Sequence, residues 1–241
     1  KVNLSFSFRH NRVDPLFRSV AAYAQADRLD NQYELTASIG EVTASVAHNR
    51  LNDNLDDVPS ILKTLTRRNA FTLGVPLASL FGTTNGAAKW LPQLSYNFDR
   101  THAFGAFLPI NSDFALSHVP DQASTNHNFN AEWQRERWRF GYRFNRSFQD
   151  NRQVGRERAD FRTMVNAFNF GVKPQRRVDL NFDLSSEQAS NLEVNRLDRT
   201  LRATFSTNLQ TTKNSTLAAT ISSAFSGDAA NTNRARNADL D

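Results

Sequence analysis

The sequence predicts an all-β fold, namely an antiparallel transmembrane β-barrel or a large segment of one, with roughly twelve long strands. Three observations carry this prediction. Apolar and polar residues alternate with a period of two along most of the chain. The alternating stretches are longer than ordinary globular strands, and the connections between them are alternately short and long. The prediction therefore places short turns on one rim and long loops on the other.

The alternation is clearest in three stretches. Residues 3–9, 34–39 and 42–47 each place an apolar side chain at every second position. Such a strand has one apolar face and one polar face. The alternation within 137–149 continues over a longer stretch than the ~5–6 residues of an average globular strand. Tilted strands that cross a bilayer need ~9–11 residues, so these lengths favour a membrane barrel.

Turn chemistry fixes the first hairpin. Apolar positions are odd-numbered from Leu35 to Ile39 and even-numbered from Val42, a switch that a two-residue turn at Gly40 and Glu41 produces. Glycine at the first turn position favours a type II′ hairpin. Further tight turns are predicted within 134–137, 173–177 and 210–215. The long polar connections are predicted at 11–32, 49–67, 110–124, 150–160 and 185–196.

Two of the long connections also carry helix signals. Asp14 followed by Pro15 is typical of a helix start, and a second, weaker signal lies in 59–63. The barrel is predicted as one domain over 1–226. Alternation then stops, so 227–241 is expected to be a polar loop or a disordered tail. Because the chain lacks a terminal aromatic strand, further strands are expected beyond it.

Composition narrows the function classes. Hydrophobic residues make up 39% of the chain, below the ~45–50% usual for soluble domains. There is no cysteine, which excludes disulfides and zinc–thiolate sites. The net charge is +5, with 24 arginines and 5 lysines, and arginine suits bidentate pairing with carboxylates or phosphates. Because the arginines are spread along strands and alternate with phenylalanine, no nucleic-acid partner is expected.

Several stretches resemble a unit found in large, poorly characterised bacterial outer-membrane β-barrel proteins of porin-like type. They are Arg12–Ser19 with Asp27, the strand Tyr33–Ile39, the segment Arg50–Leu55 and the strand Leu91–Asn97. The resemblance covers about the first hundred residues by motif. It implies a place in the bacterial outer membrane, with outer-membrane lipid and other envelope protein subunits as partners. It implies a porin-like or a secretion- or assembly-associated role.

No catalytic or cofactor motif is present. The sequence has no nucleophile elbow, dinucleotide fingerprint or phosphate-binding loop, and its five histidines lack metal-ligand spacing. We therefore expect no enzyme activity and no cofactor. The acidic stretch Asn52–Asp57 offers Asp53, Asp56 and Asp57 as weak calcium ligands, but it departs from the EF-hand pattern. We expect a solvated turn there and no metal.

The alternation assigns candidate residues to two faces. The expected lipid-facing residues are Trp138, Phe140, Tyr142, Phe144 and Phe205. The expected lumen-lining residues are Arg137, Arg139, Arg143, Arg202, Asp179 and Asp183. This set predicts either a charged lumen that filters solutes or a closed lumen braced by arginine–carboxylate pairs. The alternative function is a soluble, surface-exposed β-rich adhesin or fibre subunit without a pore.

Overall fold

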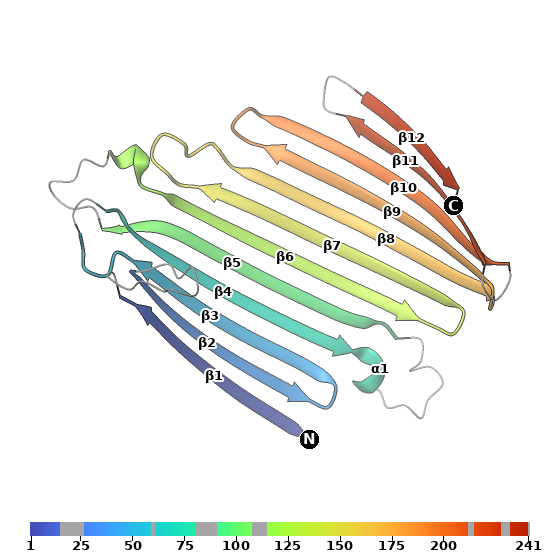
Figure 1. Cartoon of the computed structure of the whole chain (residues 1–241), viewed down its shortest axis with the longest axis horizontal. Helices are drawn as coiled ribbons and strands as arrows, with labels where there is room; N and C mark the ends of the chain where they lie inside the picture. The colour runs from blue at the N-terminus through green and yellow to red at the C-terminus, as the bar shows by residue number, and fades with distance from the viewer. Residues whose placement is uncertain are drawn as a thin grey trace. The chain divides into compact units, whose positions relative to one another are not determined.

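The computed structural model describes residues 1–14, 27–58, 61–80, 91–107, 115–211, 215–227 and 232–240, and these form an all-β structure (Figure 1). Twelve strands form one antiparallel sheet in which each strand pairs with its neighbours in sequence. The strands are β1 (Val2–Val13), β2 (Arg28–Ile39), β3 (Val42–Asp53), β4 (Lys63–Pro76), β5 (Gln93–Phe107), β6 (Asp121–Gln134), β7 (Trp138–Asn151), β8 (Phe161–Gln175), β9 (Val178–Asn191), β10 (Arg196–Gln210), β11 (Thr216–Gly227) and β12 (Thr232–Leu240). The predicted fold class is confirmed.

The first hairpin has the predicted register. Ile39 pairs with Val42 across the turn, and the pairing continues to Arg28 and Asp53 at the far end of β2 and β3. Gly40 has a φ of 61°, whereas Glu41 is not among the residues with positive φ. A positive φ at the first turn position alone fits the type II′ turn. Because the turn sets the register, it also sets which side chains share a face.

The sequential order of the strands puts alternate connections on opposite rims. The short-turn rim carries the predicted turns after β2, β6, β8 and β10. It also carries an unpredicted long connection, 77–92, which starts with the short helix α1 (Leu77–Leu80). The long-connection rim carries 14–27, 54–62, 108–120 and 152–160, together with the shorter 192–195 and 228–231. The short helix η2 (Leu116–His118) lies in one of these connections.

Several strands are longer than the stretches of apolar alternation from which they were predicted. β9 continues to Asn191 and pairs with the start of β10, where a long loop was predicted over 185–196. The single strand β5, Gln93–Phe107, likewise runs well beyond the strand Leu91–Asn97 named in the sequence analysis. The reason is that neighbouring strands supply backbone hydrogen bonds whatever the side chains are. Polar strand ends therefore extend beyond the apolar stretch of the sheet.

The end of the chain also differs from the prediction. The tail 227–241 was expected to be a loop or disordered, but Thr232–Leu240 forms β12 and pairs with β11. The sequence of this strand combines asparagine and arginine with alanine, so it lacks the apolar alternation that marks the other strands. Backbone pairing with β11 holds it in the sheet.

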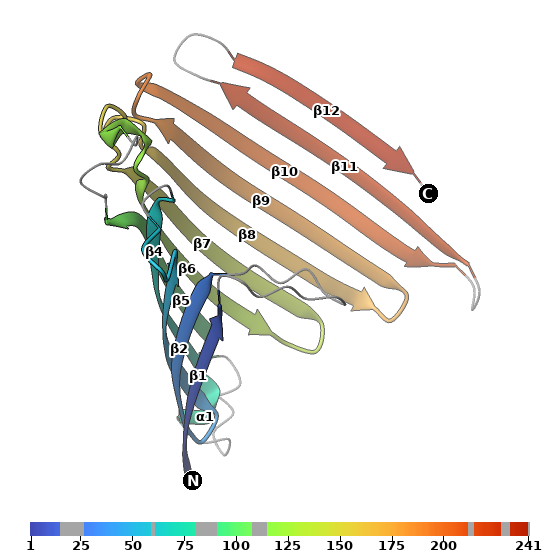
Figure 2. The same ribbon diagram turned by 60° about the vertical axis from the view of Figure 1, so that its left-hand side comes forward.

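The contacts divide the chain into two compact units. Unit 1 comprises Lys1–Leu73, Asn97–Asn126 and Phe148–Asp160, and unit 2 comprises Gly74–Tyr96, His127–Ser147 and Phe161–Asp241. Figure 2 shows β8 to β12 of unit 2 side by side in chain order. The first predicted loop helix falls on 15–26, outside the described residues. In the second, only Ile61–Lys63 are described; Ile61 and Leu62 are not helical and Lys63 starts β4.

Packing within the described residues is sparse. Leu65, Ala123 and Ala131 are the hydrophobic residues that are buried there, whereas many large hydrophobic side chains are exposed, such as Phe6 at 67%. No helix of the described residues is long and apolar enough to cross a bilayer. A sheet with so little core requires another apolar medium or partner against its exposed apolar side chains.

Candidate functional site

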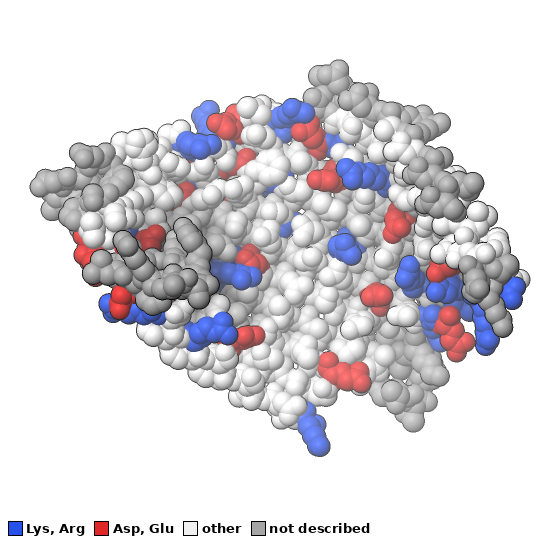
Figure 3. Space-filling view, in the orientation of Figure 1, with Lys and Arg blue, Asp and Glu red and all other residues white. Residues whose placement is uncertain are grey.

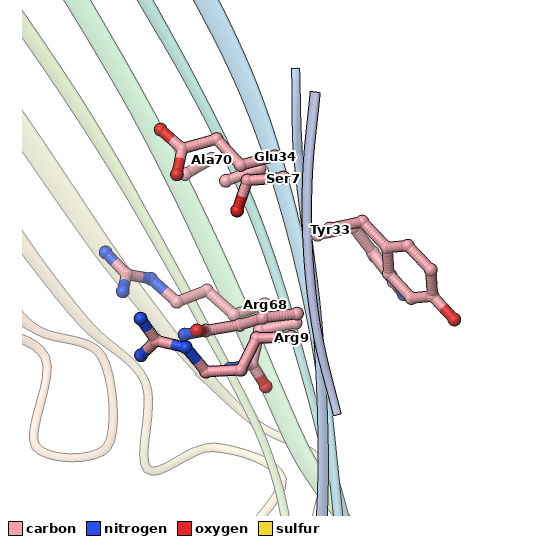
Figure 4. A pocket seen from close by; sticks show the side chains of 10 residues that line it. Ser7, Arg9, Tyr33, Glu34, Arg68 and Ala70 are labelled. Atoms are coloured by element: carbon pink, nitrogen blue, oxygen red, sulfur yellow. The ribbon is translucent and has the colours of Figure 1, made fainter. Parts of the chain in front are cut away.

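The candidate site is the pair of surfaces formed by the two faces of the sheet. In unit 1, Phe8 pairs with Tyr33, which pairs with His48, so these rings share one face. Figure 4 shows the labelled side chains of Ser7, Arg9, Glu34, Arg68 and Ala70 on the opposite side of the strands from Tyr33. We call the face with Phe8 and Tyr33 the apolar face of unit 1, and the face with Arg9 and Glu34 its polar face.

Unit 2 has the same division. On β8 to β10, Phe170 pairs with Phe182, which pairs with Phe205, and this defines the apolar face of unit 2. The neighbouring positions define its polar face, where Asn169 pairs with Asp183 and Asp183 pairs with Thr204. Because the side chains of a strand alternate, the register places Arg202 on the polar face as well.

Contacts between β7 and β8 place the predicted β7 residues. The rings of Tyr142 and Phe168 lie 4.8 Å apart, so Tyr142 belongs to the apolar face. Arg139 Nη2 donates to Asn181 Oδ1 at 2.8 Å on the polar face. By alternation, Trp138, Phe140 and Phe144 join Tyr142, and Arg143 joins Arg139. Arg137 lies in the β6–β7 turn, where it lines a pocket together with Arg139 and Asp179.

The two predicted sets within the strands thus occupy opposite faces of unit 2. The polar set is Arg139, Arg143, Arg202, Asp179 and Asp183, and the apolar set is Trp138, Phe140, Tyr142, Phe144 and Phe205. That one face contacts lipid and the other lines a lumen stays a prediction. Figure 3 shows acidic and basic side chains interspersed over the surface turned toward the viewer.

Glycines allow polar side chains to lie flat against the polar face of unit 2. A Cβ on Gly141 would lie 2.1 Å from Asn169 Oδ1, and a Cβ on Gly171 would lie 2.7 Å from Arg139 Nε. Arg139 therefore passes directly over the backbone of Gly171 to reach Asn181. Gly141 also lines a shallow pocket with Arg143 and Asp183. The missing side chains open this part of the polar surface.

The polar faces differ in how their charges are paired. In unit 1, Arg68 Nε lies 2.6 Å from Asp99 Oδ2, and Arg28 Nη2 lies 3.8 Å from Asp30 Oδ2. In unit 2, Lys173 Nζ lies 3.1 Å from Asp179 Oδ2. Within the part of the chain that the structure describes, Arg143 and Arg202 make no ion pair. An arginine–carboxylate ladder is therefore absent at these two positions.

Two of the three weak calcium candidates, Asp53 and Asp57, have other partners. The carboxylate of Asp53 accepts hydrogen bonds from the backbone N–H and the hydroxyl of Thr64, and Asp57 Oδ1 lies 2.6 Å from Lys63 Nζ. The described residues contain no group of three or more histidines and carboxylates arranged to hold a metal ion. Through these contacts, Asp53 and Asp57 instead hold the end of β3 and the residues that follow it against the start of β4.

Sequence reasoning missed the role of Asn54. Its side chain is 2% exposed and its φ is 47°. The Nδ2 atom donates to Val58 O at 3.0 Å and to Ile61 O at 2.7 Å, and the Oδ1 atom accepts from Val58 N at 2.8 Å. One side chain thus satisfies three backbone groups of the β3–β4 connection. Asparagine tolerates the left-handed backbone conformation that this position requires.

Tyrosine pairs were also missed. Tyr96 Oη lies 2.8 Å from His127 Nδ1, and Tyr142 Oη donates to Asn166 Oδ1 at 2.9 Å. In unit 1, the rings of Tyr33 and His48 lie 6.2 Å apart on the apolar face. Tyrosine suits the border between an apolar region and water, because its ring is apolar and its hydroxyl is polar.

The loop after β7 is held by local polar contacts. Asp150 forms an ion pair with Arg152 at 2.6 Å, and this partner raises the pKa of Arg152 above its usual value. The Gly155 N–H donates to Glu157 Oε1 at 2.9 Å, which lowers the pKa of that carboxyl. Both charged residues stay ionised at neutral pH, so the ordered loop presents fixed charges.

Comparison with known proteins bears on the fold. No protein-family model and no curated protein matches the chain. A solved structure, the ferric yersiniabactin uptake receptor FyuA from Yersinia pestis, matches with a TM-score of 0.53 and 12% identity. The chain has the fold of part of an outer-membrane β-barrel. The match covers 89% of this chain and 40% of the receptor chain, so the chain spans well under half of that protein.

Proposed function

We propose that the chain forms the wall of an integral outer-membrane transport barrel. The apolar faces of its units contact lipid, and the polar face of unit 2 lines a water-filled path for anionic solutes. A transport role goes beyond the shared fold, because uptake is the function of the matching receptor, and only the fold is shared with this chain. The proposal covers a porin-like or uptake role.

The observation that carries the proposal is the exposure of large apolar side chains on one face. In unit 2, Phe170, Phe182 and Phe205 are 44%, 42% and 42% exposed and pair directly with one another. In unit 1, Phe6 pairs with Leu35 and both are exposed. Soluble monomers rarely expose continuous apolar patches of this kind. Lipid is the medium in which such a face is stable.

The charges on the polar face of unit 2 support an anion path. Arg139, Arg143 and Arg202 lie on this face, and Arg143 and Arg202 have no carboxylate partner among the described residues. Of the two predicted acids on the face, Asp179 is paired with Lys173 and Asp183 has no ion pair with any residue that the structure describes, so the three arginines outnumber the single unpaired acid of this set. Arginine is ionised at every physiological pH. Unpaired cations along a water-filled path attract anions and repel cations.

Membrane insertion is the first test. We expect the full chain to fractionate with outer membranes and to require detergent, because water cannot cover its exposed apolar faces. The measurement is flotation with phosphatidylcholine vesicles after extraction with alkaline carbonate. A monodisperse species that stays in solution without detergent would contradict the proposal and favour the adhesin or fibre alternative.

Ion selectivity tests the path. In the double variant Arg139→Glu with Arg143→Glu, we expect the selectivity to move from anions toward cations, because the two positions change from positive to negative. The measurement is the reversal potential of the reconstituted protein in a planar bilayer under a salt gradient. The matched control is Arg146→Glu on the same strand, which alternation places on the other face.

Two results would count against the path. An unchanged reversal potential in a folded, conducting double variant would exclude Arg139 and Arg143 from the conducting path. A wild-type protein that inserts but does not conduct would support the closed lumen predicted as the second possibility from the sequence.

A further inference from the structure

The apolar face of unit 1 becomes basic near the long-connection rim. Arg12 pairs with Leu29, and Arg50 pairs with Asn31. Leu29 and Asn31 lie four and two residues before Tyr33 on β2, so both pairs lie on the apolar face. These two arginines lie beyond the row of Phe8, Tyr33 and His48, on the side away from the short turns.

The neighbouring strands β4 and β5 continue the pattern. His48 Nδ1 lies 2.7 Å from Asn69 Oδ1, so Asn69 faces the same way, and so does Arg67 two residues earlier. The guanidinium of Arg67 lies 5.4 Å from the ring centre of Phe104, which places Phe104 and, by alternation, Arg100 on this face. We call Arg12, Arg50, Arg67 and Arg100 the basic belt.

Acids are few on the side of the belt. Arg12 forms an ion pair with Asp14 at 2.9 Å, and Asp121 lies 2.7 Å from His102 on the apolar face. All carboxylates within β1 to β5 lie on the polar face of unit 1; they are Asp30, Glu34, Asp53 and Asp99. The polar-face arginines Arg28 and Arg68 pair with two of these acids. In contrast, Arg50 and Arg100 are exposed and form no side-chain hydrogen bond or ion pair with the described residues.

Position and charge together point to a ligand. The belt borders the apolar side chains that the proposed function places in lipid, so its arginines lie where hydrocarbon gives way to headgroups. Long arginine side chains reach such a boundary while their stems remain against apolar surface. Their planar donors match phosphate oxygens, and phosphate supplies a negative partner for Arg50 and Arg100, which have none among the described residues.

We propose that the basic belt binds the phosphate groups of phosphorylated lipid in the leaflet on the long-connection side. This inference rests on the proposed function, because it requires the apolar face of unit 1 to contact lipid. It adds a specific class of lipid partner. It also gives the barrel wall an orientation, since the longer connections of outer-membrane barrels face the outside.

The test compares two triple variants of the full chain. The belt variant is Arg50→Gln, Arg67→Gln and Arg100→Gln. The control is Arg9→Gln, Arg28→Gln and Arg68→Gln, which removes the same charge from the opposite face. The probe is purified short-chain lipopolysaccharide, with its phosphates present or chemically removed, and retention is measured on the immobilised protein in neutral detergent.

We expect the wild type and the control to retain the phosphorylated lipid about tenfold better than the dephosphorylated lipid. We expect the belt variant to lose this preference. Equal retention of the two lipids by the wild type, or equal losses in the two variants, overturns the proposal.

Insertion is measured in parallel by flotation with phosphatidylcholine vesicles. If the wild type does not insert, both the proposed function and the belt are wrong. If it inserts but shows no phosphate preference, only the belt is wrong.

Discussion

Replacing Ala203 with arginine is expected to destabilise the protein folded in a bilayer by about 2–4 kcal/mol, the cost of a cation on the lipid face near the midplane. Ala203 lies between Leu201 and Phe205 on the apolar face of unit 2 and pairs with Leu184 and Ser223. The measurement is a urea titration of the protein folded into lipid vesicles, followed by tryptophan fluorescence.

The matched control is Thr204→Arg, one residue further along β10. Thr204 pairs with Asp183 and Ser222 on the polar face, where an added cation meets water and a carboxylate. We expect this variant to change the folding free energy by about 0.5 kcal/mol or less. Similar losses at the two positions would show that the faces are assigned incorrectly.

Replacing Asn54 with alanine is expected to destabilise the β3–β4 connection by about 2–4 kcal/mol. The substitution leaves the Val58 N–H and the Ile61 carbonyl without the Asn54 side chain, whereas the Val58 carbonyl keeps the Ile61 N–H at 3.0 Å. It also places alanine at a φ of 47°. The measurements are the urea titration and the hydrogen exchange of the Val58 amide, which we expect to become faster.

Asn195→Ala separates the two causes of that loss. Asn195 also has a positive φ, 48°, but it is exposed and its side chain makes no hydrogen bond with the described residues. Its replacement is expected to cost only the backbone strain, about 1–2 kcal/mol. A loss at Asn54 no larger than the loss at Asn195 would contradict the role of the three hydrogen bonds.

The fold class could be predicted because alternation reports directly on the two faces of a strand. Gly40 and Glu41 indicated the register of the first hairpin, since a change from odd to even apolar positions requires a turn with an even number of residues and glycine favours the two-residue turn. The polar strand ends could not be predicted. The end of β9 around Ser190 and the whole of β12 show no apolar alternation. Their pairing depends on the backbone of a neighbouring strand.

The candidate site was predictable only in part, for a similar reason. Arg139 and Tyr142 lie on opposite faces of the sheet because their positions on the same strand, β7, differ by an odd number of residues. The partners of Asn54, by contrast, depend on how the chain folds back within 54–62, which no periodic pattern encodes. The contact between Tyr96 and His127 joins strands separated by the long connection 108–120, so their register could not be counted from the sequence.

The strand order has a consequence for how the protein assembles. Each strand pairs only with its neighbours in sequence, so every pairing closes a loop no longer than the connection between two strands. The entropy lost on closing such loops is small and rises slowly with their length. Hairpins can therefore form one after another along the chain, and a newly arriving strand always finds its template in the strand that preceded it.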